Sequence, residues 1–454
     1  MFASEIKGLF VYPGIVPEVD ESGWNEVLGL GPAKTSGNGV FKNVKEVRPG
    51  HLLINDDRGL RDYCYCQLKA EEHKENYEKT VEHTRELVTD AIKRQMVSDV
   101  PIATFLSGGI DSSIVSAVCA RELEKEGKTL GSFSFDFMGN EIYFQANSFQ
   151  RTQDRPFVEI MVDKLKTKHR FLVCDNNALY EQLFSSVDSR DLPTMADVDS
   201  SMLYFCKQVS HYNKVVLTGE CADEIFGGYP WFYREEDFQT DTFPWSKDLS
   251  PRKCMLKDEV LRRLRMEEYV HEAYKQTIRE TPKLEGETKV QTRRREIQYL
   301  NIRWFMQTLL DRMDRTSMAH GLEARVPFAD KRIIQYLYNV PWEMKCQNQV
   351  EKSLLRDAMG DLLPEEILHR KKSPYPKTYH PEYEERLKFE LRKVVEGEEE
   401  PLLEIVDKEK VLRYMGEKKD YGRPWYGQLM AGPQMLAYLL QINYWMKKYD
   451  VHFG

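Results

Sequence analysis

The chain has 454 residues, enough for two or three domains of ordinary size and for a sizeable buried core. Its composition, 41% hydrophobic and 30% charged, is typical of a globular protein, and its apolar runs, such as 100–106 and 435–442, are too short to cross a membrane. The formal net charge of -8 argues against a polyanion such as nucleic acid as the partner.

Residues 1–70 contain Gly and Pro scattered between short apolar patches, and only 52–54 has the pattern of a strand. Because so few apolar clusters bury little surface, this part is not expected to fold alone. The first ten residues lack the basic segment and apolar core of a secretory signal, which predicts a cytoplasmic protein. The eight cysteines include no C-x-x-C pair, so we expect reduced thiols rather than a zinc or redox site.

An alternation of helices and strands begins at residue 75. Apolar residues recur every three or four positions over 75–97, which predicts an amphipathic helix. Strands are predicted at 101–106, 130–135, 170–173 and 215–217, with helices at 112–126, 156–165, 179–187 and 200–210 between them. This order predicts an α/β fold, a parallel sheet with helices on both faces that binds its ligand at the carboxyl ends of the strands.

The segment 107–113, SGGIDSS, follows the first of these strands and opens the next helix. Gly108 and Gly109 let the backbone approach a ligand closely, so that N–H groups converge on an anion while Ser107 and Ser112 add hydroxyl donors. The positive end of the helix adds to the attraction. We interpret the segment as a phosphate-binding loop; the alternative is a Gly-Ser turn that only caps the helix.

This loop differs from the two common nucleotide motifs, because neither G-x-x-x-x-G-K-(S/T) nor G-x-G-x-x-G is present in it. It resembles instead the pyrophosphate loop of the ATP pyrophosphatases, enzymes that cleave ATP between its α and β phosphates and transfer AMP. A carboxylate at Asp111 would repel pyrophosphate unless a Mg²⁺ lay between them, so we expect ATP together with Mg²⁺ at this loop.

A second loop, 217–229 with the sequence LTGECADEIFGGY, follows the fourth predicted strand. Its glycines allow a tight backbone, and Glu220, Asp223 and Glu224 place three carboxylates within one or two helical turns. Acids of this kind also favour a helix N-terminus, which is the purely structural interpretation. Their position at the mouth of a phosphate site favours metal and substrate ligands.

Beyond about residue 255 the strand signals stop, and long periodic segments such as 293–320 predict a mostly helical C-terminal part. We expect 235–251, rich in Asp, Thr, Ser and Pro, to be an exposed excursion. Helical spacing places Asp311 and Arg315 on one face, where they would form a salt bridge. The basic segment 370–377, RKKSPYPK, is pinned by prolines and would suit a pyrophosphate group or a phosphoryl transition state.

Taken in order, the two loops, the segment 311–330 and the basic segment closely resemble the synthetase domain of glutamine-dependent asparagine synthetases. The chain is similar to S-G-G-(L/I/V)-D-S-S, to (S/T)-G-E-G-(A/S)-D-E-(L/I)-F-G-G-Y and to M-(A/S)-x-x-x-E-x-R-V-P-F-x-D, with Cys221 in place of the usual glycine. FASEIK and GNGVFKNVKEVRPGH, near the start, look like the end of that family's glutaminase domain.

The resemblance covers nearly the whole chain and implies two parts. Residues 1–70 would be the remnant of a glutamine amidotransferase domain of the N-terminal nucleophile type. Residues 75–454 would be an asparagine synthetase domain, with the adenine nucleotide α-hydrolase-like sheet of the ATP pyrophosphatases and a mostly helical C-terminal part.

The resemblance also implies an activity, the ATP-dependent synthesis of asparagine from aspartate through β-aspartyl-AMP, with release of AMP and pyrophosphate. Glu220, Asp223 and Lys372 would be catalytic: Glu220 bounds the pocket for AMP and aspartate, and Lys372 stabilises charge as the acyl-adenylate forms. Asp111 and Asp223 would meet Mg²⁺. The residues implied to bind ATP and pyrophosphate are Ser107, Gly108, Gly109, Asp111, Ser112, Ser113, Ser134, Phe135, Thr218 and Gly219.

The chain departs from the family at its start, where the family has a nucleophilic cysteine and this chain has Met1 and Phe2. We therefore expect a truncated glutaminase half and a synthetase that takes free ammonia, with ATP, aspartate and ammonia as its partners and a homodimer as an open option. Two alternatives stay open: an adenylating ligase of β-lactam synthetase type, and a non-catalytic remnant that acts at most as a binding subunit.

Overall fold

The computed structural model describes residues 1–146, 150–416, 424–427 and 429–454. It confirms the predicted α/β fold, because one sheet of five strands has the order β5-β4-β3-β6-β7 and every neighbouring pair in it is parallel. Its strands are β3 (Ile102–Phe105), β4 (Gly131–Phe137), β5 (Lys168–Cys174), β6 (Val215–Leu217) and β7 (Glu323–Arg325).

Although the sequence gives no strand signal beyond about residue 255, one short strand there, β7, adds an edge to the sheet. Leu217 of β6 lies beside Arg325 of β7, and Thr218 donates its N–H to the Arg325 carbonyl at 2.9 Å. Strand β7 has three residues, two of them charged, so it carries neither the length nor the alternating apolar pattern that marks a strand in a sequence.

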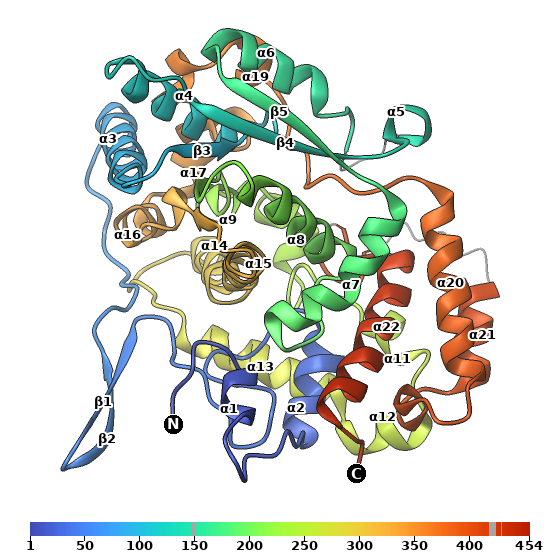
Figure 1. Ribbon diagram of the computed structural model, residues 1–454. Helices are drawn as coiled ribbons and strands as arrows, with labels where there is room; N and C mark the ends of the chain where they lie inside the picture. The colour runs from blue at the N-terminus through green and yellow to red at the C-terminus, as the bar shows by residue number, and fades with distance from the viewer. Residues whose placement is uncertain (147–149, 417–423, 428) are drawn as a thin grey trace.

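Helices cover both faces of the sheet, as the alternation of strands and helices predicts (Figure 1). Successive residues of β6 point to opposite faces: Val215 and Leu217 belong to the same core cluster as Ile114 of α4, whereas Val216 belongs to another with Met202 of α8. The helices of this part are α3 (Tyr77–Gln95), α4 (Ile110–Glu124), α5 (Asn140–Tyr143), α6 (Arg155–Leu165), α7 (Asn176–Arg190), α8 (Asp197–Ser210) and α9 (Ala222–Phe226).

The C-terminal part is helical, as predicted, apart from the edge strand. The predicted helix 293–320 consists of α14 (Lys289–Leu300), a π-helical segment over Asn301–Met306 and α15 (Gln307–Met318). The other helices are α10 (Glu235–Phe238), α11 (Ser250–Lys253), α12 (Asp258–Leu264), α13 (Met266–Glu280), α16 (Lys331–Asn339), α17 (Trp342–Lys345), α18 (Ser353–Met359), α19 (Glu365–Leu368), α20 (Pro381–Glu396), α21 (Lys408–Gly416) and α22 (Gly432–Tyr449).

The segment 235–251 is not simply an exposed excursion. Phe243 and Trp245 are buried in the largest core cluster of the described chain, and the Phe243 ring lies edge-on to Trp304 with the centroids 4.9 Å apart. Because the residues around them are mostly polar, the composition of the segment does not indicate that these two aromatic residues are buried.

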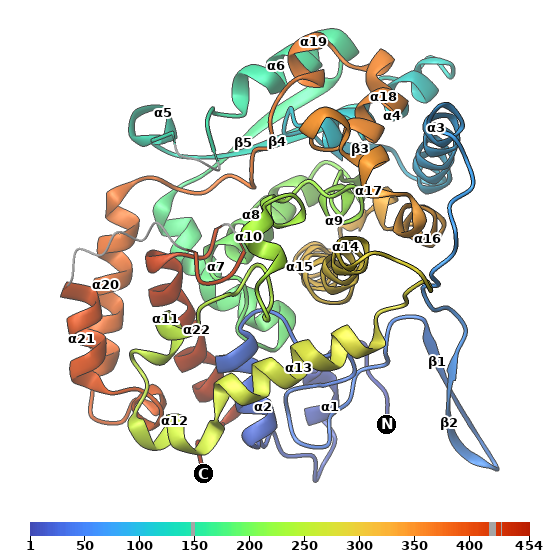
Figure 2. The same ribbon diagram turned by 180° about the vertical axis from the view of Figure 1, so that it is seen from behind.

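Residues 1–70 divide into a packed segment and a projecting hairpin. Trp24 of α2 (Glu21–Asn25) lies edge-on to Trp445 of α22 at 5.7 Å, and Tyr438 donates its hydroxyl to the Val27 carbonyl at 2.8 Å. The predicted strand at 52–54 is part of β1 (His51–Asp56), which pairs antiparallel with β2 (Gly59–Cys64). Figure 2 shows this hairpin extending away from the body, and α1 (Lys7–Phe10) completes this part of the chain.

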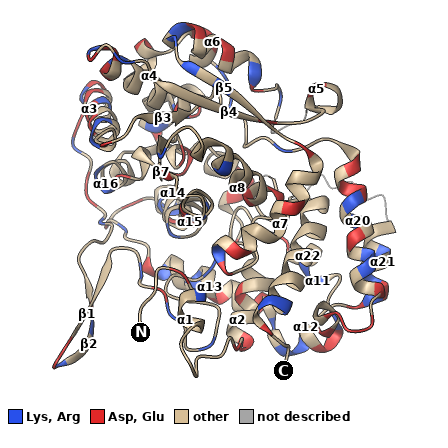
Figure 3. Cartoon of the chain, viewed as in Figure 1, with Lys and Arg blue, Asp and Glu red and all other residues tan. Residues whose placement is uncertain are grey.

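None of the helices in the described ranges combines the length and the apolar character that a bilayer crossing requires. In the view of Figure 3, Lys and Arg residues are interspersed with Asp and Glu along α20 and α21. All eight cysteines are free thiols in the structure.

Candidate functional site

A cavity of about 250 Å³ lies at the carboxyl ends of β3, β4 and β6, and we call it the site cavity. It brings together most of the predicted site residues from loops far apart in the chain: Ser107, Gly109, Asp111, Ser112, Ser134, Phe135, Thr218, Gly219, Glu220, Asp223 and Lys372. Gly108 and Ser113 do not line it. Gly108 lies behind the loop against α6, and the Ser113 side chain is fully buried in α4.

The phosphate-binding loop has the geometry that its glycines suggest. Gly108 has φ of +66°, and a Cβ there would lie 2.6 Å from Cβ of Phe157, so only glycine fits between the strand and α6. Helix α4 begins at Ile110 with no side-chain cap on Gly109. Its first backbone N–H groups, at the edge of the site cavity, are therefore left for a ligand, and its dipole favours an anion.

Two serine hydroxyls hold the loop closed. Oγ of Ser112 accepts the Ser107 N–H at 3.2 Å and lies 3.0 Å from Oγ of Ser107. Both hydroxyls face the cavity and form hydrogen bonds with each other, so they are ordered before any ligand arrives.

The second loop lies directly on the start of α4. A Cβ on Gly219 would be 2.5 Å from the Ser112 nitrogen and 2.7 Å from the Asp111 carbonyl carbon, which leaves no room for any other residue. The neighbouring Thr218 accepts the Glu220 N–H on its Oγ1 at 3.3 Å. The contact fixes the carboxylates of the second loop beside the phosphate-binding loop.

Four charged side chains form a compact cluster at this junction: Asp111, Asp223, Lys352 and Lys372. Lys352 Nζ donates to Oδ2 of Asp111 at 2.7 Å and also forms an ion pair with Asp223. Lys372 forms a second ion pair with Asp223. Two lysines between two carboxylates make a cluster with no net charge, and all four residues line the site cavity.

The two carboxylates of this cluster differ in their proton affinity. Burial disfavours the charged form of Asp223, but Lys352 and Lys372 outweigh it and lower the pKa of Asp223 to about 2. The pKa of Asp111 is raised by burial, because Lys352 opposes this only in part and Asp223 adds repulsion. The attraction of both carboxylates raises the pKa of Lys352, which therefore stays protonated despite burial.

Lys352 was not predicted from the sequence. It is 4% exposed, lies just before α18 in the left-handed region with φ of 55°, and is 241 residues from Asp111. A single lysine ahead of a short helix has no spacing pattern, so only the tertiary structure reveals it.

The basic segment 370–377 contributes one lysine to the cluster and one arginine to the framework. Arg370 is buried and donates to the Ser107 carbonyl at 2.9 Å and to Asp154 at 2.5 Å. The Lys372 N–H donates to Glu351 at 2.8 Å. Arg370 thus ties the segment to the phosphate-binding loop, and the tie places Lys372 Nζ beside Asp223.

Glu220 is held by an arginine that sequence reasoning did not select. Arg312, 5% exposed on α15, forms an ion pair with Glu220 Oε1, while Glu220 Oε2 is buried without a hydrogen-bond partner. The sequence suggested a salt bridge between Asp311 and Arg315, and it is present at 3.7 Å. The next residue along the helix, Arg312, faces the cavity instead, because successive helical residues are about 100° apart.

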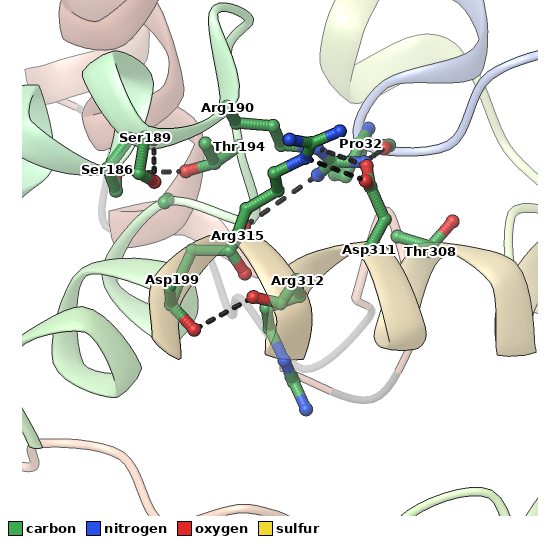
Figure 4. Close-up of polar contacts among 12 residues, drawn as sticks. Pro32, Ser186, Ser189, Arg190, Thr194, Asp199, Thr308, Asp311, Arg312 and Arg315 are labelled. Atoms are coloured by element: carbon green, nitrogen blue, oxygen red, sulfur yellow. Dashed lines mark hydrogen bonds and ion pairs between the residues drawn. The ribbon is translucent and has the colours of Figure 1, made fainter. Parts of the chain in front are cut away.

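Behind Glu220, Arg312 adjoins a buried ionic network that reaches the N-terminal segment. Arg190 lies 2.8 Å from Asp311 and 3.7 Å from Asp199, and it donates to the Pro32 carbonyl at 3.1 Å (Figure 4). Burial raises the pKa of Asp199, while Arg190 and Arg312 act against that rise. The network fixes α15, and with it Arg312, relative to residues near 32.

The third acid of the second loop is turned toward a tyrosine. The Tyr229 hydroxyl donates to Glu224 Oε1 at 2.6 Å, and burial raises the pKa of Glu224 to about 7, with the charge of Asp223 adding to the rise. Glu224 therefore does not join Asp111 and Asp223 in the lysine cluster. Among the described residues, no group of three or more His, Cys, Asp or Glu side chains is arranged to hold a metal ion.

Ser134 and Phe135 lie in the second half of β4, just beyond the point where it pairs with the last residue of β3, and they line the cavity. Ser134 Oγ is 2.9 Å from Nε2 of His169, whose pKa burial lowers to about 4. The Phe135 ring stacks on Phe205 at 4.3 Å and is therefore part of the core as well as of the cavity wall.

Cys221 stands where the resemblance gives glycine, and its backbone shows why glycine would suit. Its φ is +72°, in the left-handed region that disfavours residues with a Cβ. The thiol is buried, and burial raises its pKa well above the ordinary value. It is therefore a packed side chain and not an activated nucleophile.

Comparisons with known proteins agree with the motifs. A family model described as asparagine synthase matches residues 83–447. The chain is 45% identical over 453 residues to glutamine-hydrolyzing asparagine synthetase 3 of Bacillus subtilis (strain 168), covering 99% of this chain and 74% of that protein. It is 28% identical over 409 residues to glutamine-hydrolyzing asparagine synthetase 1 of the same organism, covering 83% of this chain and 62% of that protein.

A comparison with solved structures gives a weaker resemblance. NMN synthetase from Francisella tularensis is 14% identical, with a TM-score of 0.23, and the match covers 51% of this chain and 93% of that one. This similarity is too low to indicate a shared structure or role. Glutamine-hydrolyzing asparagine synthetase 1 of Lotus japonicus is 26% identical over 379 residues, which make up 79% of this chain and 52% of that protein. The chain thus spans about three quarters of the first relative's length and smaller shares of the others.

Proposed function

The chain belongs to the asparagine synthase family, and we propose that its site converts aspartate to asparagine through β-aspartyl-AMP, releasing AMP and pyrophosphate. The observation that carries this proposal is the cluster of Asp111, Asp223, Lys352 and Lys372 at the start of α4, with Glu220 beside it. Such a cluster offers cations to phosphate oxygens and carboxylates to a metal in one place.

ATP would lie with its phosphates at the phosphate-binding loop. The uncapped start of α4 supplies N–H donors, and Lys352 and Lys372 would exchange their present carboxylate partners for phosphate oxygens. Ser134 and Phe135, in the second half of the neighbouring strand, are proposed to lie near the adenine.

The acids fit a Mg²⁺ that is shared with the nucleotide. Mg²⁺ is commonly held by one or two carboxylates together with substrate phosphates, and Asp111 Oδ1 is buried without a hydrogen-bond partner. The cluster has no net charge of its own, so a triphosphate needs an added cation to be neutralised. We propose Asp111 and Asp223 as its ligands; the ion would supply charge neutralisation to the leaving pyrophosphate.

In the first step a β-carboxylate oxygen of aspartate attacks the α phosphorus. A phosphorus–oxygen bond to the carboxylate forms as the bond to the β-phosphate oxygen breaks, and pyrophosphate leaves with that electron pair. Lys372 is proposed to stabilise the negative charge that accumulates in this transition state. Glu220, held by Arg312, is proposed to form the wall that orients the acyl-adenylate.

In the second step ammonia attacks the acyl carbon, and AMP leaves with the oxygen that joined it to the carbonyl. The attacking nitrogen loses one proton on forming the amide. We propose that residues 1–454 take this nitrogen from free ammonia. Among the residues that line the site cavity, Cys221 has a thiol whose pKa burial raises, so this cavity itself offers no activated thiol.

Three further proposals concern the chain as a whole. Residues 75–454 are proposed to be the synthetase domain, and residues 1–70 the remnant of a glutamine amidotransferase domain of the N-terminal nucleophile type. We also propose a homodimer and a cytoplasmic location. Cross-linking at several protein concentrations tests the dimer, and cell fractionation tests the location.

The test of the activity is the product balance of the purified chain with ATP, Mg²⁺ and aspartate. We expect AMP, pyrophosphate and asparagine in equal amounts when ammonium is added, and no asparagine when glutamine replaces it. Formation of ADP, or AMP release that ignores aspartate, would contradict the adenylation of aspartate. Asparagine formed from glutamine by this chain would contradict the ammonia proposal alone.

A further inference from the structure

A second cavity, of about 540 Å³, adjoins the site cavity, and we call it the outer cavity. Five of its lining residues are Lys or Arg, namely Arg151, Arg234, Arg356, Lys371 and Lys372, and His369 adds a sixth nitrogen base. Glu351 is the acid among the residues that line it. The cavity is thus strongly basic although the whole chain carries a net charge of -8.

Three of these basic residues have protein partners: Lys372 pairs with Asp223, His369 lies 2.9 Å from Glu365, and the Arg356 guanidinium donates to backbone carbonyls. The other three are poorly compensated by protein groups. In the described part of the chain, Arg151 and Lys371 are exposed and form no ion pair, and the nearest acid to Arg234 is Glu236 at 3.9 Å. Glu351 already accepts the Lys372 N–H at 2.8 Å and lies 3.6 Å from Arg356. Like charges gathered around one hollow repel each other, so an anion bound there would be stabilised.

The two cavities share one wall. Glu351, Arg356, Lys371 and Lys372 line both of them. Lys372 therefore faces Asp223 in the site cavity and also borders the outer cavity. An anion that leaves the phosphate end of the site cavity along this wall would pass from one set of cations to the next without crossing an apolar barrier.

We propose that the outer cavity is a second oligophosphate site, which binds inorganic pyrophosphate as it leaves the site cavity. The role as a release site rests on the proposed function, because adenylation produces pyrophosphate; the site itself rests on the cavity and its cations. Tyr233, which also lines it, adds a hydroxyl donor to the guanidinium and ammonium groups. Pyrophosphate fits this cavity by charge, because several cations can contact its oxygens at once.

The test is a calorimetric titration of the full chain with pyrophosphate while a non-hydrolysable α,β-methylene analogue of ATP saturates the site cavity. We expect one pyrophosphate to bind beside the analogue. In the double variant Arg151→Gln/Arg234→Gln, which alters residues that line the outer cavity alone, we expect the pyrophosphate affinity to fall about tenfold. The analogue should bind the variant as it binds the unaltered chain.

The matched control is Arg262→Gln/Lys331→Gln, which removes the same two charges from exposed positions elsewhere and should leave the pyrophosphate affinity unchanged. Absence of pyrophosphate binding beside the analogue, or equal affinity in the two double variants, overturns the proposal. So does tighter binding of ATP or of inorganic phosphate than of pyrophosphate in the outer cavity. The titration needs no turnover, so a chain that binds pyrophosphate here yet makes no asparagine would refute the proposed function and not this site.

Discussion

Removing the shared lysine of the site, by Lys352→Met, should destabilise the fold because two buried carboxylates lose the cation that pairs with both of them. Lys352 Nζ is 2.7 Å from Asp111 Oδ2, and the side chains of the pair are 4% and 16% exposed. Without the ammonium, Asp111 and Asp223 face each other with Lys372 as the remaining cation of the cluster. The partner variant is Asp111→Asn, which removes one carboxylate and keeps its shape.

The magnitude follows from the distance and the burial. Two unit charges about 4 Å apart attract by ~4 kcal/mol at an effective dielectric constant near 20, and breaking a buried pair from one side costs about 3–5 kcal/mol of unfolding free energy. We expect Lys352→Met alone to cost about 4 kcal/mol and the double variant markedly less than the sum of the two single variants, with a coupling of about 3 kcal/mol.

The assay is urea unfolding of the ligand-free chain at neutral pH, followed by both fluorescence and circular dichroism, in a double-mutant cycle over Lys352 and Asp111. The pair Lys166 and Asp163 is the control, because its distance is similar, 2.6 Å, while its side chains are 77% and 84% exposed. Its coupling should stay below about 0.5 kcal/mol. A coupling for Lys352 and Asp111 as small as that of the control would refute the electrostatic account of the cluster.

Four other predictions concern single positions. Gly219→Ala places a Cβ within 2.5 Å of the Ser112 nitrogen, so we expect its ATP affinity, measured by calorimetry, to fall at least about tenfold. The control variant Gly131→Ala should bind ATP normally, because its Cβ would lie an ordinary 3.4 Å from Ala103. Cys221→Gly should be more stable to urea than Cys221→Ala by about 1 kcal/mol, because φ of +72° strains any residue with a Cβ; the reverse order would contradict the strain. Arg312→Leu leaves Glu220 without its cation and should lower kcat/KM for aspartate about 100-fold. Arg315→Leu, on the same helix but outside the cavity lining, should leave kcat/KM unchanged. Equal losses in the two variants would show that the effect comes from disturbing the helix and not from the contact with Glu220. His169 should titrate near pH 4 by NMR, because burial favours its neutral form. Its contribution to stability is therefore complete above about pH 6.5 and is lost as the pH falls through about 4. A midpoint near about 6.5 would show that the ring is solvated.

The strands that carry the site were predictable because each is an apolar run followed by a polar loop. Strands β3 and β6 end directly before the two loops that hold Ser107 and Glu220, and parallel strands bring such loops to one edge of the sheet. The expected strand β4 likewise places Ser134 at the same edge. The edge strand β7 was missed because three residues with two charges leave no apolar alternation.

The sequence by itself determined four strands of the sheet, its two loops and the family, since these depend on local order: an apolar run, a glycine turn and the start of a helix follow one another along the chain. Tertiary structure alone decided the partners of the charged groups. Lys352 meets Asp111 from 241 residues away and Arg312 meets Glu220 from 92 residues away, so neither pair leaves a periodic trace in the sequence. Which charges meet in a buried site is set by how the helices pack on the sheet, because only burial makes their attraction strong.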